Sequence, residues 1–188
     1  MGLTHPLDYR NAPKIVSHYR SQGKKVVLAR GTFDIFNLGH LDFLSRAKDL
    51  GHILMVNVNS DLWVINRKGI KPARDEIKRA MLVGGQEPVD YVFVHPSNPP
   101  YDIHPAIELA IESKPNILVR EDKDPEFQEL EKKILMEHLG PGDIPEYHAL
   151  PRSTYSESSS EIKQAIIDQA KEEIIRKALA EMGIYDLT

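Results

Sequence analysis

The feature that most constrains this chain is a repeated alternation of short apolar segments with longer amphipathic ones. The apolar segments have the length of buried strands, and they are Lys25–Ala29, Ile53–Val58, Tyr91–His95, Ile117–Val119 and Glu146–Leu150. The segments between them repeat apolar residues at helical spacing, and they are Gly39–Leu50, Asp75–Val83, Pro105–Glu112 and Pro125–Leu139. Buried strands that alternate with helices form a parallel sheet covered on both faces. The sequence therefore predicts an α/β fold with a doubly wound, Rossmann-like sheet of five parallel strands.

The flanks of this pattern are also helical. A helix over Ala12–Gln22 ends at Gly23, a plausible C-terminal cap, and it forms a lead-in over residues 1–23. A long helix over Ser160–Met182 closes the chain, within residues 160–183. A chain of 188 residues has the size of one domain, so we predict a single domain over residues 1–188. The last helix carries apolar residues at every fourth position, a stripe that must be buried on its own domain or in a dimer.

Composition excludes several classes of function. The net charge is −4, so the chain lacks the global basic character of a nucleic-acid or acidic-membrane binder. The absence of cysteine excludes disulfides, thiolate metal sites and cysteine nucleophiles, and the histidines lack paired metal-ligand spacing. We find no signal-peptide pattern and no apolar stretch of about 18 residues. We therefore expect a cytoplasmic protein with no metal site of its own, no nucleic-acid partner and no membrane partner.

The strand-to-helix turn "RGTFDIFNLGH", Arg30 to His40, is the first candidate site. In such sheets, ligands bind beyond the carboxyl ends of the strands, where strand order reverses. Glycine lets the backbone approach a ligand closely, and a helix that starts near Gly39 offers amide groups to an anion. His40 adds a donor in the same place. The turn therefore indicates phosphate binding, although it matches neither the Walker loop nor the dinucleotide fingerprint.

The segment "GTFDIFNLGH" resembles the G-(T/C)-F-D-x-x-H-x-G-H signature of the cytidylyltransferase-like nucleotidyltransferases. The resemblance continues in family order through "QGKKVVLARGTFD", "VNVNSD", "RKGIKPARDEIKR", "VDYVFV", "SKPNILV" and "LPRSTYSESSSEI". Within the family it is closest to heptose 1-phosphate adenylyltransferase, followed by glycerol-3-phosphate and choline-phosphate cytidylyltransferases.

The resemblance implies a reaction, a cofactor and partners. A phosphorylated sugar or polyol attacks the α-phosphorus of ATP or CTP, with ATP favoured, and pyrophosphate is released. Mg²⁺ arrives with the nucleoside triphosphate, and the protein is a homodimer. Because the attacking phosphate is already an anion, catalysis rests on positioning and on neutralising charge, with no protein nucleophile or general base.

The same resemblance assigns residues to roles. His40, Asn37, Lys68 and Arg79 take the catalytic positions around the phosphates. The nucleotide-binding set comprises Gly31, Thr32, Phe33, Asp34, Gly39, Arg120, Ser158, Ser159 and Ser160, with the serines at the β- and γ-phosphates. Structural alternatives stay open: a capping role for His40 or for the serines, and a solvated basic face that includes Lys68 and Arg79.

Asn37 stands where the family signature has its first histidine. An asparagine amide can donate a hydrogen bond but cannot carry a positive charge. Three hypotheses follow: an active nucleotidyltransferase, a nucleotide-binding protein that has lost turnover, and an interaction module whose long last helix is the functional part. The sequence leaves the acceptor open and separates ATP from CTP only weakly.

Overall fold

The computed structural model describes residues 5–96, 103–122, 125–155 and 159–181. They fall into two compact units, Met1–Ser156 and Glu157–Thr188. The first unit contains the whole sheet, and the described part of the second is one helix. That the two units act as a single domain stays a prediction.

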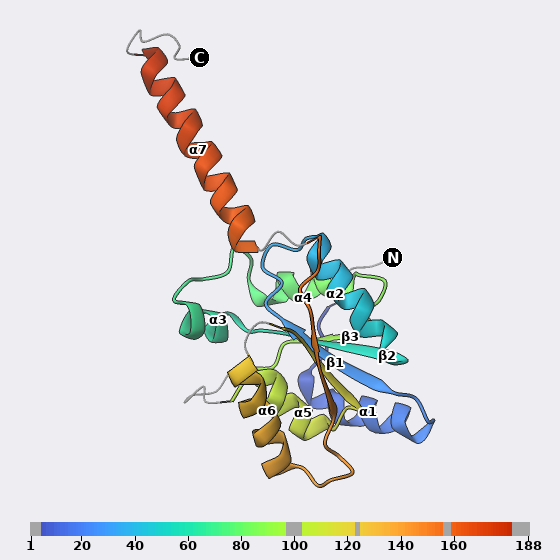
Figure 1. Ribbon diagram of the computed structural model, residues 1–188. Coiled ribbons are helices and arrows are strands. Elements are labelled where there is room, and N and C mark those ends of the chain that lie inside the picture. Colours follow the sequence, from blue (N-terminus) through green and yellow to red (C-terminus); the bar gives the residue numbers. More distant parts are fainter. Residues whose placement is uncertain (1–4, 97–102, 123–124, 156–158, 182–188) are drawn as a thin grey trace. The chain divides into compact units, whose positions relative to one another are not determined.

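The first unit is built around five parallel strands in the order β3-β2-β1-β4-β5 (Figure 1). The strands are β1 Val26–Gly31, β2 Ile53–Val58, β3 Tyr91–Phe93, β4 Ile117–Glu121 and β5 Glu146–Leu150. The predicted five-stranded parallel sheet is confirmed, with β1 at its centre and neighbouring strands on either side. Strand order reverses between β1 and β4, which places the β1–α2 turn where ligands bind in such sheets.

The helices follow the predicted alternation. They are the 3₁₀-helix η1 Tyr9–Asn11 and the α-helices α1 Ala12–Ser21, α2 Leu38–Asp49, α3 Asp61–Lys68, α4 Glu76–Gly84, α5 Pro105–Ser113, α6 Pro125–His138 and α7 Ser159–Glu181. Most predicted boundaries lie within two residues of the observed ones. Helix α3 was not predicted, although Ser60 caps its start and Gly69, at a φ of 67°, ends it.

Three predicted strands change length for identifiable reasons. β1 runs over Val26–Gly31 rather than Lys25–Ala29, because it pairs with β2 as far as Gly31. β3 ends at Phe93 rather than at His95, because the backbone N–H of His95 donates to the side chain of Asn57 (3.1 Å). β4 continues past Val119 to Glu121, because β5 pairs with it along that whole length. All three strands change at the carboxyl edge of the sheet, where polar side chains replace apolar ones.

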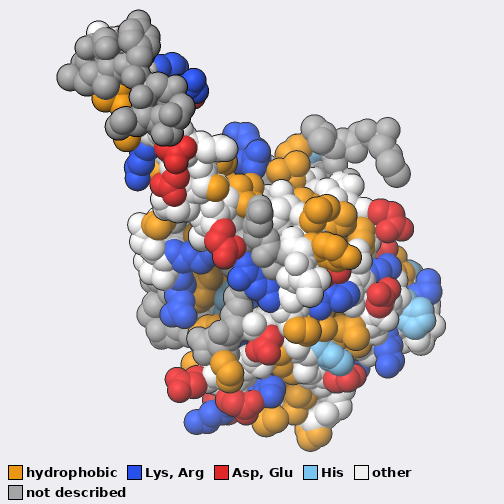
Figure 2. Space-filling view, turned by 45° about the horizontal axis from the view of Figure 1, so that its top comes forward, with side chains coloured by type: hydrophobic (Ala, Val, Ile, Leu, Met, Phe, Trp, Pro, Cys, Tyr) orange, Lys and Arg blue, Asp and Glu red, His pale blue; other side chains and the backbone are white. Residues whose placement is uncertain are grey.

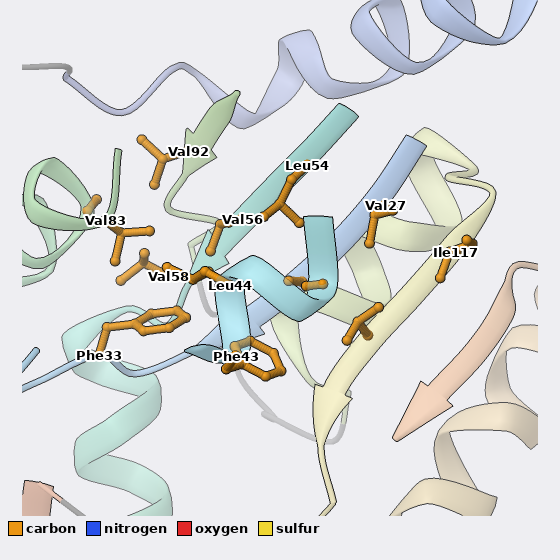
Figure 3. Close-up of a cluster of buried hydrophobic side chains, with 14 residues drawn as sticks. Val27, Phe33, Phe43, Leu44, Leu54, Val56, Val58, Val83, Val92 and Ile117 are labelled. Carbon is orange, nitrogen blue, oxygen red and sulfur yellow. The ribbon is translucent and has the colours of Figure 1, made fainter. Parts of the chain in front are cut away.

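A hydrophobic layer covers each face of the sheet. Alternate residues of β1 point to opposite faces, so Val27 packs with α2 and α4 while Leu28 packs with α1, α5 and α6. Figure 3 shows the first layer, with Leu44 of α2 and Val83 of α4 against the strands. By the same alternation, Arg30 lies on the face of α5 and α6, at the carboxyl end of β1.

The face of the molecule drawn in Figure 2 carries no broad field of one sign. Figure 2 shows Lys and Arg side chains interspersed with Asp and Glu over the face turned to the viewer, in keeping with the net charge of −4. In α7, Ile166, Ile167, Ile174 and Ile175 are exposed. Among the described residues, no helix combines the length and the apolar character needed to cross a membrane.

Candidate active site

The turn after β1 is shaped by its own side chains. Phe33 has a φ of 51°, unusual for a residue other than glycine, and its ring is buried over Gly31. A Cβ on Gly31 would lie 2.7 Å from two atoms of that ring. Gly31 is therefore required by the packing of Phe33, a reason independent of the approach of a ligand.

Asn37 is the N-terminal cap of α2. Its Oδ1 accepts a hydrogen bond from the backbone N–H of His40 (3.2 Å), and Nδ1 of His40 accepts one from the backbone N–H of Asn37 (3.2 Å). This is a reciprocal capping box with histidine at its third position. Because Nδ1 of His40 is an acceptor, the neutral imidazole carries its proton on Nε2.

The His40 ring is also held by two phenyl rings. Its centroid lies 5.3 Å from that of Phe33, at an interplanar angle of 63°, and 5.6 Å from that of Phe36, at 33°. The capping bond and these contacts fix both the tautomer and the orientation of the imidazole. The start of α2 therefore presents helix N–H groups, and an imidazole of fixed tautomer, at the sheet's point of strand reversal.

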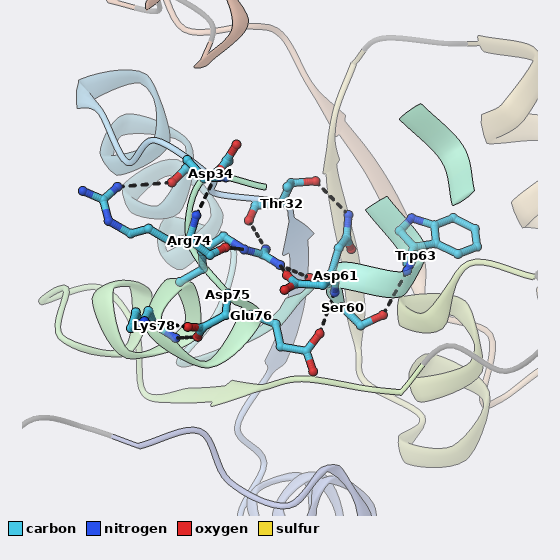
Figure 4. A network of polar contacts seen from close by, with 12 residues as sticks. Thr32, Asp34, Ser60, Asp61, Trp63, Arg74, Asp75, Glu76 and Lys78 are labelled. Carbon is cyan, nitrogen blue, oxygen red and sulfur yellow. Dashed lines mark hydrogen bonds and ion pairs between the residues drawn. The ribbon is translucent and has the colours of Figure 1, made fainter. Parts of the chain in front are cut away.

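Asp34 connects this turn to the segment between α3 and α4 (Figure 4). Its buried carboxylate accepts hydrogen bonds from the backbone N–H of Ala73 (2.7 Å) and of Arg74 (3.4 Å). The Arg74 guanidinium donates to the Asp34 carbonyl in return (3.4 Å). Asp34 thus positions a neighbouring loop, and direct contact with a nucleotide stays a prediction.

Arg79 is fully buried beneath the same loops. It donates to the carbonyls of Thr32 (2.5 Å), Asn59 (2.8 Å) and Arg74 (3.0 Å), and to the carboxylate of Asp61 (2.7 Å). Figure 4 shows this network, which connects the turns after β1 and β2 with the entry to α4. The geometry favours a positioning role for Arg79 over the direct phosphate contact expected from the family resemblance.

The remaining predicted residues lie in several places. Thr32 accepts a hydrogen bond from Asn59 through its hydroxyl (3.2 Å), and Gly39 is buried in the first turn of α2. Lys68 is exposed in the last turn of α3. Ser158 lies outside the described residues, Ser159 begins α7, and Ser160 is exposed. Contacts of Lys68 and of the three serines with phosphate stay predictions.

Arg120, which the family resemblance places at the nucleotide, lies partly buried in an ionic cluster that the sequence did not predict, and its contact with a nucleotide stays a prediction. Glu131 of α6 is paired with Nη2 of Arg30 (2.5 and 2.6 Å) and with Nη1 of Arg120 (3.3 Å). The Tyr147 hydroxyl donates to Glu131 as well (2.6 Å), and burial beside that carboxylate raises the pKa of Tyr147. One signal was present in the sequence: Arg30 is a charged residue inside an otherwise apolar strand.

The carboxylates and histidines do not gather into a cation cage. Within the parts of the chain that the structure describes, no group of three or more His, Asp or Glu side chains is placed to hold a metal ion.

Comparison with known proteins identifies the family. The model of the family described as cytidylyltransferase-like matches residues 28–165. The bifunctional protein HldE of Wolinella succinogenes is 40% identical over 108 residues, which are 57% of this chain and 22% of that protein. HldE of a Nitratiruptor species is 38% identical over 114 residues, 60% of this chain and 23% of that protein. The chain thus spans less than a quarter of the length of these curated relatives.

Two solved structures share the fold. The lipopolysaccharide core biosynthesis protein from Thermoplasma volcanium has a TM-score of 0.54 and 27% identity, covering 71% of this chain and all of that one. Pantoate-beta-alanine ligase from Francisella tularensis has a TM-score of 0.55 at 15% identity, covering 79% of this chain and 69% of that one, a likeness of fold alone. The resemblance drawn from the sequence motifs is confirmed.

Proposed function

The chain belongs to the cytidylyltransferase-like family of nucleotidyltransferases, and we propose that it transfers a nucleoside monophosphate to a phosphorylated small molecule. The observation that carries the proposal is the start of α2. There the Asn37–His40 capping box and the two phenyl rings fix an imidazole at the point where strand order reverses.

The chemistry needs few protein groups. An oxygen of the acceptor phosphate attacks the α-phosphorus, a new P–O bond forms, and the bond to the bridging oxygen breaks as pyrophosphate leaves. The N–H groups of α2 and the Nε2–H of His40 would stabilise negative charge on the transferring group. Mg²⁺, held chiefly by the triphosphate oxygens, would supply further charge neutralisation.

We favour ATP as the nucleotide and a sugar or polyol phosphate as the acceptor. Two observations support this preference: the sequence resemblance to heptose 1-phosphate adenylyltransferases, and the likeness to a lipopolysaccharide core biosynthesis protein at 27% identity. The experiment is a measurement of pyrophosphate release with each of four nucleoside triphosphates against a panel of phosphorylated sugars and polyols. Release with CTP alone would overturn the choice of nucleotide.

The role of His40 is best tested with His40→Gln. Glutamine at the third helical position can still accept from the backbone N–H of Asn37, so the capping box survives while the imidazole is lost. We expect kcat/KM to fall roughly a hundredfold, as for the loss of a transition-state donor. His138→Ala, at an exposed histidine of α6, is the matched control. Unchanged activity of His40→Gln would reduce His40 to a capping residue.

A second candidate function is nucleotide binding without turnover. Asn37 in place of the signature histidine favours it, because a neutral amide supplies less charge to the transition state. Calorimetry with Mg-ATP separates the two: binding without pyrophosphate release from any acceptor would support the second candidate.

We further propose that the protein is a homodimer, in which the apolar residues of α7 pack against a second copy. Sedimentation at micromolar concentration tests this, and a monomer would contradict it. A cytoplasmic location stays a prediction from the sequence.

A further inference from the structure

Two buried donors at the carboxyl edge of the sheet have no hydrogen-bond partner among the described residues. They are Nη1 of Arg30 and Nδ2 of Asn57. Arg30 and Asn57 face each other in the register of β1 and β2, so their side chains are neighbours on the α5/α6 face. The Arg30 side chain is 6% exposed and Asn57 is 0% exposed. Unpaired buried donors are costly, so both point to a ligand that completes them.

Each donor is held in place by a contact that a second atom of the same side-chain group makes. Nη2 of Arg30 is paired with Glu131, and Oδ1 of Asn57 accepts from the backbone N–H of His95. The free nitrogen of each residue therefore has a fixed position. Both are donors, so the group that satisfies them must offer acceptor oxygens.

The arginine side chains near these donors favour an anionic ligand. Arg67 and Arg120 lie over the ring of Phe127, with guanidinium carbons 5.2 and 5.5 Å from its centroid. Arg30 and Arg120 share the carboxylate of Glu131. Two guanidinium groups, those of Arg30 and Arg120, thus share one carboxylate, and the exposed Arg67 lies over the same phenyl ring as Arg120.

His104, the N-terminal cap of α5, lies in the same part of the molecule, and its pKa responds to the same arginines. Burial lowers its pKa well below the ordinary value, and Arg30, Arg120, Arg67 and then His95 lower it further. The His104 ring contacts the ring of Trp63, with centroids 4.7 Å apart, and the Arg67 guanidinium lies over that same Trp63 ring at 5.9 Å. The imidazole stays neutral, so it adds no charge of its own.

We propose that Arg30, Asn57, Arg67 and Arg120 form the subsite for the phosphate group of the acceptor. The inference rests on the proposed function, which it deepens by assigning the acceptor's place. Arg30 immediately precedes Gly31, so a phosphate held by its guanidinium lies next to the turn that would receive the α-phosphate. In the transfer itself an unbound oxygen of that phosphate attacks, and no proton has to move.

Asn57→Asp is the sharpest variant. The new carboxylate can still accept from the His95 N–H, and its second oxygen offers an acceptor on the same face of the sheet as Nη1 of Arg30. We therefore expect the variant to be more stable than the wild type, with a Tm about 2–4 °C higher. The same carboxylate should repel phosphate, weakening its binding by tenfold or more.

The binding experiment uses inorganic phosphate as the probe. Calorimetry is done with the nucleotide site filled by Mg-α,β-methylene-ATP, which resists cleavage at the reacting bond. Arg67→Gln, at an exposed residue, should weaken phosphate binding about tenfold. Arg176→Gln, which removes the same charge from an exposed position in α7, should leave it unchanged.

The outcomes separate this inference from the function it rests on. Phosphate affinity that is unchanged in Asn57→Asp and Arg67→Gln, or a wild type that binds no phosphate beside the nucleotide, overturns the subsite. Weaker binding of the nucleotide analogue in these variants, with phosphate binding intact, assigns the arginines to the nucleotide and also overturns it. Phosphate binding that depends on these residues supports the subsite even where no pyrophosphate is released, a result that counts against the proposed reaction alone.

Discussion

Two buried arginines at the carboxyl edge of the sheet differ in how the protein satisfies them. Arg79 makes four hydrogen bonds, three of them to backbone carbonyls of neighbouring loops. Arg30 is paired with Glu131 through one nitrogen, while Nη1 has no partner among the described residues. Both side chains are almost fully buried, so exposure to solvent does not account for the difference.

This difference in hydrogen bonding indicates that the region around Arg79 is structural and that the region around Arg30 binds a ligand. The Arg79 network is completed by the chain itself, and it holds the loops that carry the candidate nucleotide site. The Arg30 region keeps two buried donors that have no partner among the described residues, and such donors cost stability until a ligand completes them. Proteins retain such costs mainly where function requires them.

The largest expected effect is that of Arg79→Met. The substitution leaves the Asp61 carboxylate and three carbonyls without their donor, so the free energy of unfolding should fall by about 3–5 kcal/mol in urea denaturation. Lys78→Met removes the same charge from an exposed position on the same helix, where solvent screens the ion pair with Asp75, and should leave stability nearly unchanged. A loss as small in Arg79→Met as in the control would mean that Arg79 does not hold the loops, which would restore a direct role at the phosphates.

Arg30→Met should cost about 3 kcal/mol, because it leaves Glu131 with a weaker set of partners. Adding Glu131→Gln removes the uncompensated charge while keeping an acceptor for Tyr147. We expect the double variant to regain most of the lost stability but to bind phosphate no better than Arg30→Met. Urea denaturation and phosphate calorimetry on the two single variants and the double variant check this. A double variant as unstable as Arg30→Met would make Arg30 structural, as Arg79 is, and remove the contrast.

The sequence predicted the architecture because the pattern of buried strands is local and repeated. Strands such as Ile53–Val58 are buried throughout and apolar except for Asn57, and a parallel sheet is the arrangement that buries them on both faces. The motif at Gly31–His40 was found for a similar reason, since its residues are adjacent in the chain. The sequence could also have revealed α3, from its cap at Ser60 and from Gly69.

The ionic cluster could not be predicted in the same way. Arg30 and Glu131 are a hundred residues apart in the chain, and their pairing depends on how α6 crosses the sheet. Likewise, the sequence alone gives Arg79 the character of an exposed cation on α4. Only the positions of the three loops around it show that it is buried. Long-range polar contacts follow from packing, which no local pattern encodes, although Arg30 and Asn57 were visible as polar residues inside apolar strands.

The pH dependence of stability tests the charge around Arg30 through the pKa of His104. Its depressed pKa means that below about pH 6.5 the unfolded chain binds a proton that the folded protein does not. The contribution of His104 to the free energy of unfolding is therefore complete above that pH. It falls as the pH decreases, by at most about 1.4 kcal/mol per pH unit. His104→Asn should keep the cap of α5 and lose this dependence between pH 6.5 and 5. Parallel stability curves for wild type and variant would show that His104 titrates normally and that the arginines do not act on it.

The smallest expected effect concerns Asn37, which belongs to the region that the chain completes itself. Asn37→Ala removes the acceptor for the His40 N–H and should cost about 1 kcal/mol in thermal denaturation. Asn37→Ser keeps a capping oxygen and should cost only a few tenths. Equal losses in the two variants would contradict the capping role.

Measurements of activity show whether Asn37 contributes to catalysis in addition to capping α2. Asn37→His restores the family signature and adds a group that can carry positive charge, so we expect kcat to rise with little change in KM. Asn37→Ala should lower kcat/KM by removing the amide, whereas Asn37→Ser isolates that effect, because the cap remains while the amide donor is gone. If Asn37→Ser retains full activity, the residue acts through the helix start alone, by fixing His40. If Asn37→His loses activity although α2 remains folded, the turn is built around asparagine, and the departure from the signature is a specificity device.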